Sequence, residues 1–140
     1  MAHKCTAIMF HCIDFRLIGE TRRWMREEGL LGDCDVVSVA GAAKQIADGS
    51  PEVRDFLLNQ IRIARDLHHV SRVILAHHSS CGAYKASYNF ATPEEESKKQ
   101  SEDMAAAGRI IQDRFPGIEV VNIWVQMLDD SGHKAEFRKI

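Results

Sequence analysis

The chain lacks the features that mark several large classes of protein. No apolar run approaches the roughly 20 residues needed to cross a bilayer. Residues 1–16 lack the basic head and long apolar centre of a secretion signal. The net charge is only -2, and the Lys and Arg residues are dispersed among acidic residues, so there is no basic stripe to bind nucleic acid. We therefore expect a cytoplasmic protein that binds neither membranes nor nucleic acid.

The sequence also lacks closely paired cysteines. Its four cysteines are widely and irregularly spaced, at Cys5, Cys12, Cys34 and Cys81. This spacing excludes the C-x-x-C pairs of a zinc ribbon, but it does not exclude a metal site that the fold assembles from distant segments. Because a reducing compartment disfavours disulfides, metal-binding or catalytic roles are the more reasonable expectation for these thiols.

The size and composition are those of one globular domain. The chain has 140 residues, of which 45% are hydrophobic and 27% are charged, and this is enough to bury a single core. The sequence contains no repeat, linker or low-complexity segment. We expect residues 1–140 to form one domain.

Apolar runs of strand length alternate with segments of helical periodicity. Strands are predicted at residues 6–11, 35–40, 72–77 and 119–126, and helices at residues 17–29, 51–69 and 92–115. Ser50 and Pro51 are typical of a helix start, and a turn at residues 129–132 precedes a weakly alternating edge strand at residues 134–140. The pattern predicts an α/β fold with three layers: a mostly parallel central sheet of about four strands, an antiparallel C-terminal edge strand, and flanking helices.

Potential metal ligands follow two of the predicted strands. Cys12 comes directly after the first strand, and residues 77–81 come directly after the third. Because ligands of open α/β sheets gather at the carboxyl ends of the strands, we expect Cys12, His78 and Cys81 to meet at one edge. Two thiolates and one imidazole suit Zn²⁺, and three protein ligands leave its fourth position open, as in catalytic zinc sites.

Residues 12–16 (CIDFR) and 78–83 (HSSCGA) resemble the paired signature of β-class carbonic anhydrases. The resemblance implies that Cys12, His78 and Cys81 hold zinc and that Asp14 and Arg16 form a catalytic dyad. It also implies reversible hydration of carbon dioxide to bicarbonate by a zinc-bound hydroxide that the dyad orients. Members of this family associate, so we expect a homodimer or a higher homo-oligomer.

The surroundings of this signature are more apolar than is usual in the family. The loop after the second strand reads SVAGA at residues 38–42, whereas the family commonly has Arg-Asn-Ala-Gly-Asn. Gly41, Ala42 and Gly82 are candidate pocket residues. An apolar pocket suits carbon dioxide and equally carbonyl sulfide or carbon disulfide, so a hydrolase of these sulfur analogues stays open as an alternative. The third possibility, after the carbonic anhydrase and the sulfur-analogue hydrolase, is a non-catalytic, zinc-stabilised protein in which Asp14 itself occupies the fourth zinc position.

Other histidines are expected to have supporting roles. The side chain of His77 should point to the opposite side of the strand end from His78. His11 stands in the same relation to Cys12 and would shuttle protons only if it faced the pocket. His68 and His69 close a helix, where a partly cationic imidazole interacts favourably with the helix dipole.

The remaining cysteines and a run of acidic residues have simpler interpretations. Nothing in the sequence places Cys5 or Cys34 beside a partner, so we expect both to be buried packing residues. The three glutamates at residues 94–96 are expected to form a solvated first helical turn.

Overall fold

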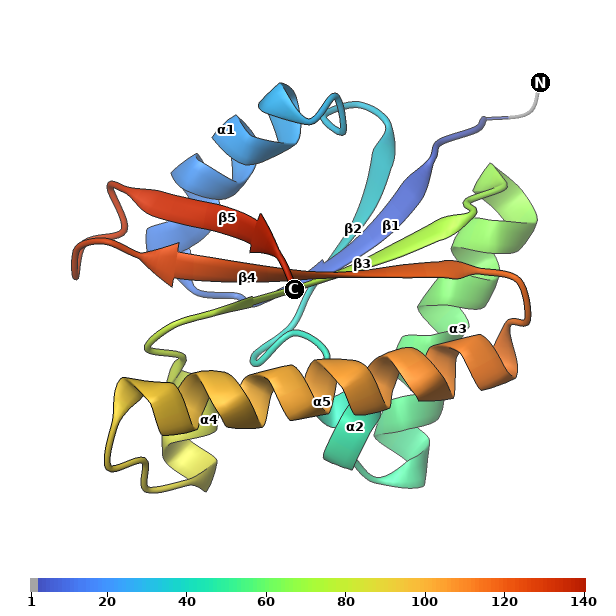
Figure 1. Cartoon of the computed structure of the whole chain (residues 1–140). Helices are drawn as coiled ribbons and strands as arrows, with labels where there is room; N and C mark the ends of the chain where they lie inside the picture. Colours follow the sequence, from blue (N-terminus) through green and yellow to red (C-terminus); the bar gives the residue numbers. More distant parts are fainter. Residues whose placement is uncertain (1–2) are drawn as a thin grey trace.

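A five-stranded sheet forms the centre of the protein (Figure 1). The structure, a computed structural model, describes residues 3–140. The strand order is β2-β1-β3-β4-β5; the first four strands are parallel, and β5 runs antiparallel to β4. The strands are β1 (Ala7–His11), β2 (Cys34–Ser38), β3 (Arg72–His78), β4 (Glu119–Met127) and β5 (Ala135–Lys139). The predicted mostly parallel sheet with an antiparallel edge strand is confirmed.

Helices cover both faces of this sheet, which gives the predicted three layers (Figure 1). One face carries the short 3-10 helix η1 (Phe15–Leu17) and α1 (Ile18–Glu27). The other face carries α2 (Lys44–Asp48), α3 (Pro51–His68), α4 (Gly82–Ser87) and α5 (Pro93–Arg114). The sequence pattern did not predict α2 and α4 as separate helices, because five or six residues are too few to display a helical period.

The long helices begin where the sequence predicts. The Ser50 hydroxyl accepts the Val53 N–H at 3.3 Å, and Pro51 is the first residue of α3. In the same way, the Thr92 hydroxyl accepts the Glu95 N–H at 3.2 Å at the start of α5. Each cap satisfies a backbone donor that the first helical turn leaves without an intrahelical partner.

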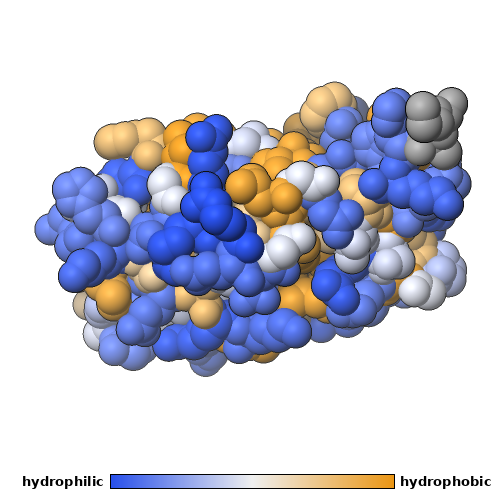
Figure 2. Space-filling model, turned by 90° about the horizontal axis from the view of Figure 1, so that it is seen from above, coloured by the Kyte–Doolittle hydropathy of each residue, from blue (hydrophilic) through white to orange (hydrophobic). Residues whose placement is uncertain are grey.

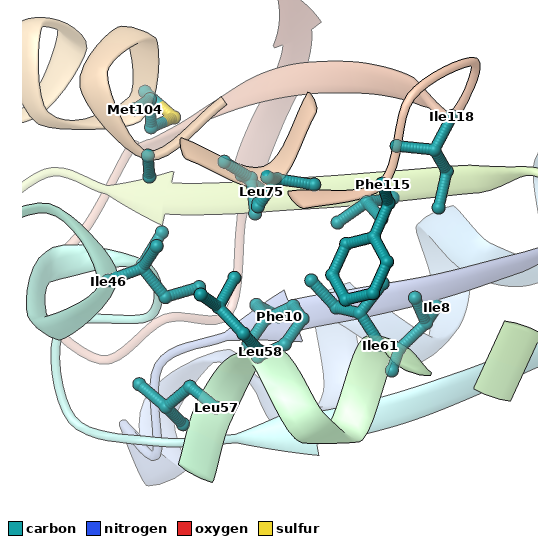
Figure 3. Close-up of a cluster of buried hydrophobic side chains, with 14 of the residues drawn as sticks. Ile8, Phe10, Ile46, Leu57, Leu58, Ile61, Leu75, Met104, Phe115 and Ile118 are labelled. Carbon is teal, nitrogen blue, oxygen red and sulfur yellow. The ribbon is translucent and has the colours of Figure 1, made fainter. Parts of the chain in front are cut away.

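Alternate side chains of the central strand β1 enter two separate cores. Ile8 and Phe10 pack with residues of α3 and α5, in the cluster shown in Figure 3. Ala7 and Met9 point the other way and pack with residues of α1, including Trp24. Since β1 is buried on both faces, its position and that of the residue after it are strongly fixed.

The face that carries α1 is covered less completely than the other face. Hydrophobic residues are visible there among hydrophilic ones (Figure 2). A cavity of about 80 Å³ between α1 and the sheet is lined by residues that include Trp24, Ile74 and Ile123. Within residues 3–140, no helix combines the length and the apolar character that spanning a membrane requires.

Candidate metal centre

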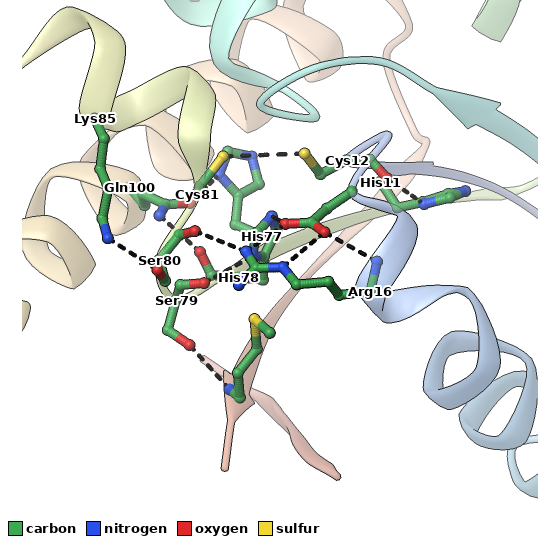
Figure 4. A network of polar contacts seen from close by, with 12 residues as sticks. His11, Cys12, Arg16, His77, His78, Ser79, Ser80, Cys81, Lys85 and Gln100 are labelled. Atoms are coloured by element: carbon green, nitrogen blue, oxygen red, sulfur yellow. Dashed lines mark hydrogen bonds and ion pairs between the residues drawn. The ribbon is translucent and has the colours of Figure 1, made fainter. Parts of the chain in front are cut away.

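The structure brings Cys12, His78 and Cys81 together at the carboxyl edge of the sheet. Cys12 follows β1, His78 ends the neighbouring strand β3, and Cys81 is the N-cap of α4. All three side chains are buried, and their candidate ligand atoms lie within 4.8 Å of one another. The two Sγ atoms are 4.0 Å apart (Figure 4). The parallel pairing of β1 and β3 thus juxtaposes residues that are far apart in the sequence.

The imidazole of His78 is oriented so that one nitrogen is free to bind. Its Nδ1–H donates to the Ser79 carbonyl oxygen at 2.7 Å, so the proton resides on Nδ1 and the lone pair on Nε2. Nε2 is buried and has no hydrogen-bond partner among the residues that the structure describes. A buried polar atom without a partner is costly, and a thiophilic cation held with the two sulfurs would satisfy it. The donor set therefore fits zinc.

The two thiols of the site are strongly coupled. A hydrogen bond from Cys81 lowers the pKa of Cys12, an effect that outweighs burial, and His78 and the Gly41 N–H lower it further. The same hydrogen bond, together with burial, raises the pKa of Cys81. One thiol of the pair therefore ionises readily, and a bound dication would favour the thiolate form of both.

Asp14 and Arg16 form a two-pronged ion pair beside the thiols. Arg16 Nε donates to Asp14 Oδ1 at 3.0 Å and Nη2 donates to Oδ2 at 2.7 Å, and this pairing holds the pKa of Asp14 below its usual value. Asp14 Oδ2 lies 3.8 Å from Nε2 of His78. Arg16 also donates to the carbonyl oxygens of Ser80, at 3.2 Å, and Asp130, at 3.3 Å. The guanidinium is thus anchored on three sides, and the carboxylate is held next to the candidate metal position.

Glu96 is a supporting residue that the sequence did not reveal. The prediction of a solvated turn at residues 94–96 is wrong for this residue, because Glu96 is only 6% exposed. Its carboxylate accepts the backbone N–H of Ser80 at 3.1 Å and of Cys81 at 2.9 Å, and also accepts from the Gln100 amide at 3.0 Å. The helix α5 packs this face of the first turn against the site instead of exposing it. Only the spacing of Glu96 and Gln100, four residues apart on one helical face, hints at a shared role.

His77 lies on the opposite side of β3 from His78, as predicted. Its Nδ1–H donates to the Gln100 side-chain oxygen at 3.1 Å, and its Nε2 accepts the Ala43 N–H at 3.1 Å. Gln100 also donates to the His78 carbonyl oxygen at 2.8 Å. Burial lowers the pKa of His77 to about 4, so the ring is a neutral connector between α5, β3 and the loop before α2.

His11 does not face the candidate metal position. Its half-buried ring donates from Nδ1 to the Cys12 carbonyl oxygen at 2.9 Å and points away from the thiols (Figure 4). Burial is the main cause that lowers the pKa of His11. This orientation gives the ring no direct path to accept a proton from the site.

The candidate pocket residues lie around the site in different settings. Gly41 has φ +76, and a Cβ there would come within 3.0 Å of the Lys44 Cβ, so the loop after β2 passes closely over α2. Ala42 is 1% exposed, with φ +53. Gly82 opens α4 and faces open space. A cavity of about 800 Å³ lies next to the ion pair, and its wall includes Arg16 and residues 79–80, but not the three candidate metal ligands.

Comparison with known families agrees with this geometry. A family described as "Putative carbonic anhydrase" matches residues 2–133. The chain belongs to this family. The match covers both halves of the candidate site, residues 12–16 and residues 78–81.

Similar proteins and structures extend the comparison over most of the chain. Uncharacterized proteins of Rickettsia bellii (strain RML369-C) and Rickettsia conorii (strain ATCC VR-613 / Malish 7) are 33% and 30% identical to it, each over 84% of this chain and over 74% and 66% of their own lengths. A carbonic anhydrase from Streptococcus mutans has a TM-score of 0.57 at 18% identity, covering 99% of this chain and 83% of its own. A structure from a study of two tetrameric β-carbonic anhydrases of Sordaria macrospora has a TM-score of 0.62 at 13% identity, covering 99% and 82%. These structures share the fold of this protein.

Proposed function

We propose that this protein is a zinc-dependent carbonic anhydrase that catalyses the reversible hydration of carbon dioxide to bicarbonate. Membership of the family supports the reaction class. The observation that carries the proposal is the buried Nε2 of His78, which has no hydrogen-bond partner within residues 3–140. It lies with two coupled thiols beside a carboxylate that is already paired to Arg16. A purely structural cluster would not require a carboxylate at this position.

The assigned ligands are Cys12, His78 and Cys81. These three donors would hold a zinc ion and leave one of its positions open, and the ion would supply the Lewis acidity that makes water a nucleophile near neutral pH. Two thiolates offset the formal charge of the ion, so water is acidified less than in a site with neutral ligands. A hydrogen-bond acceptor next to the open position therefore becomes more important for catalysis.

Asp14 is suited to be that acceptor. A carboxylate there accepts the hydrogen of the attacking oxygen and directs its lone pair toward the carbon of the substrate. Because Arg16 holds both carboxylate oxygens, Asp14 is kept from turning into the open metal position. This pairing supports the catalytic proposal over the alternative of a closed, non-catalytic zinc site.

The loop after β2 is apolar where it approaches Cys12. Ala42 and Ala43 are buried there, at 1% and 0% exposure, and the N–H of the neighbouring Gly41 faces Cys12. These groups offer no polar side chain that would discriminate between carbon dioxide and the equally linear carbonyl sulfide or carbon disulfide. Hydrolysis of these sulfur analogues by the same residues is therefore the second candidate function.

The deciding experiment is one assay of the zinc-replete protein with both kinds of substrate. Proton release on rapid mixing with carbon dioxide is expected, and it should disappear in the Cys12→Ser variant. Hydrogen sulfide release from carbonyl sulfide with weak hydration would instead select the sulfur-analogue hydrolase. Zinc binding with neither activity would overturn both catalytic proposals.

We also propose that residues 1–140 act as one domain and associate as a homodimer or a higher homo-oligomer. The partly uncovered α1 face and the exposed apolar side chains of Ile13 and Phe15, at 60% and 81%, support association. The related Sordaria macrospora enzymes are tetrameric. Light scattering coupled to size-exclusion chromatography measures the assembly directly. A cytoplasmic location stays a prediction from the sequence.

A further inference from the structure

A second group of side chains that could bind a metal lies at the amino-terminal ends of β1 and β2, whereas the candidate metal centre lies at the carboxyl ends of the strands. Cys5 precedes β1, Asp35 is the second residue of β2, and His68 is the last residue of α3. Cys5 is half-buried and packs against the core, as expected, but it also lies beside Asp35 and His68, which the sequence did not indicate. The expectation that His68 only closes its helix is wrong, because its imidazole pairs with Asp35 at 2.7 Å.

The backbone holds these three residues in fixed relative positions. The Cys5 N–H donates to the His68 carbonyl oxygen at 3.0 Å. Asp35 pairs with Ile8 in the ladder between β1 and β2, so its side chain points to the face that α3 covers. The cluster therefore joins β2 and the end of α3 to the segment that leads into β1, and the hydrogen bond of Cys5 to His68 fixes that segment.

We propose that Cys5, Asp35 and His68 form a second metal site, which binds zinc or a similar thiophilic divalent cation. Their candidate ligand atoms, a thiol sulfur, a carboxylate oxygen and an imidazole nitrogen, lie within 4.8 Å of one another. This donor set suits Zn²⁺ and Co²⁺, and the sulfur disfavours the hard cations Mg²⁺ and Ca²⁺. Three half-buried protein ligands leave room for water on the ion.

The local charges favour a cation at this position. A thiolate and a carboxylate together balance a divalent ion, and the C-terminal end of the 18-residue helix α3 adds negative potential at His68. Burial and the negative charge of Asp35 raise the pKa of Cys5, and a bound dication would reverse this effect. The metal must replace the existing hydrogen bond between His68 and Asp35, so we expect weaker binding here than at the buried centre.

The chain provides a matched control for each sulfur and imidazole ligand. Cys34 is next to Asp35 in sequence, but it packs into the core on the opposite face of the sheet. His69 is next to His68, but it is exposed and forms the helix C-cap. The variants Cys34→Ser and His69→Asn therefore remove the same kinds of group without removing a proposed ligand atom. The Cys34 thiol donates to the backbone carbonyl of Asp35 at 3.2 Å, a bond that a serine hydroxyl can also make.

The first test is the zinc content of the intact protein after equilibrium dialysis against buffered zinc. We expect two zinc ions per chain in the wild type, the Cys34→Ser variant and the His69→Asn variant, and one in Cys5→Ser and His68→Gln. Circular dichroism checks that each variant is folded. Equal zinc contents for Cys5→Ser, His68→Gln and the wild type would overturn the proposal. Since His68 is part-exposed, with a side-chain exposure of 37%, its variant should fold even if the Cys5 variant does not.

A second test separates this site from the candidate catalytic centre. In the Cys12→Ser/Cys81→Ser variant, Co²⁺ should still give a sulfur-to-metal charge-transfer absorption. A further Cys5→Ser substitution should remove this absorption, and a further Cys34→Ser substitution should preserve it. Absence of this absorption in a folded background variant, or its persistence without Cys5, would contradict the second site. Neither result depends on catalysis, so failure of this inference leaves the proposed function unaffected.

Discussion

The buried carboxylate of Glu96 accepts the backbone N–H of Cys81 at 2.9 Å, and so α5 fixes the turn that carries two of the candidate metal ligands. The same carboxylate accepts the N–H of Ser80, whose φ of +58 is unusual for a residue with a side chain. The turn between β3 and α4 is therefore held in a strained conformation by a residue that is not one of the candidate metal ligands. This gives Glu96 a positioning role.

Replacing Glu96 with Gln should weaken metal binding. A neutral amide offers one acceptor oxygen instead of two, so one of the two backbone N–H groups loses its partner, at a cost of about 1–3 kcal/mol in stability. Loss of groups that orient ligands typically lowers metal affinity about 10- to 100-fold. Competition with a chromophoric zinc chelator measures the zinc affinity. The control is Glu94→Gln, because Glu94 is an exposed residue of the same helical turn. Equal affinities of Glu96→Gln and the wild type would exclude the positioning role.

Replacing Asp14 with Asn should abolish most hydration activity while zinc stays bound. The amide cannot accept hydrogen bonds at both positions and loses its charge-assisted pairing with Arg16. We expect a loss of at least about 100-fold in kcat, the scale of a misplaced reacting group. Stopped-flow hydration and zinc analysis on the same sample check the two parts. The matched control is Asp130→Asn, because Arg16 hydrogen-bonds the backbone carbonyl of that residue and not its side chain. Unchanged activity of Asp14→Asn would remove this carboxylate from the mechanism.

The stability of the edge strand should depend on pH through Glu20. Hydrogen bonds from Arg23 chiefly lower the pKa of Glu20, and the Ala135 N–H, which Glu20 accepts at 2.8 Å, lowers it further and ties α1 to β5. The folded pKa thus lies below the unfolded value of about 4.3. The stabilisation is fully present above that unfolded value and is lost as the pH falls through the lower folded pKa. Denaturant unfolding from about pH 7 to about pH 3 should therefore show a smaller acid-induced loss in Glu20→Gln than in the wild type. If the free energy of unfolding fell equally with acid in Glu20→Gln and in the wild type, this role of Glu20 would be contradicted.

Much of the fold and the three candidate ligands could be predicted because their signals are local. The strands appear as apolar runs, and Ser50 and Pro51 mark a helix start by their own chemistry. Parallel strands bring their carboxyl ends to one edge, which placed Cys12 near residues 78–81 without any structure. Glu96 and His68 escaped prediction because their roles depend on contacts across the fold. Glutamate near a helix start and histidine near a helix end are each explained by the helix dipole alone, so their sequence neighbours contain no sign of Cys81 or Asp35.

Gly132 offers a test of how the β4–β5 turn supports the site. It has φ +75, and a Cβ at this position would overlap the backbone carbonyl of Arg16. We expect Gly132→Ala to lower stability by about 2–4 kcal/mol, from backbone strain together with steric overlap, and to lower hydration activity because Arg16 must move away from Asp14. Gly29→Ala is the matched control, since Gly29 has a similar φ of +71 but open space around it, so only strain of about 1–2 kcal/mol applies. Denaturant unfolding measures the stability of both variants, and stopped-flow hydration measures their activity. If Gly132→Ala retained full activity with the stability of Gly29→Ala, the turn would have no part in placing Arg16.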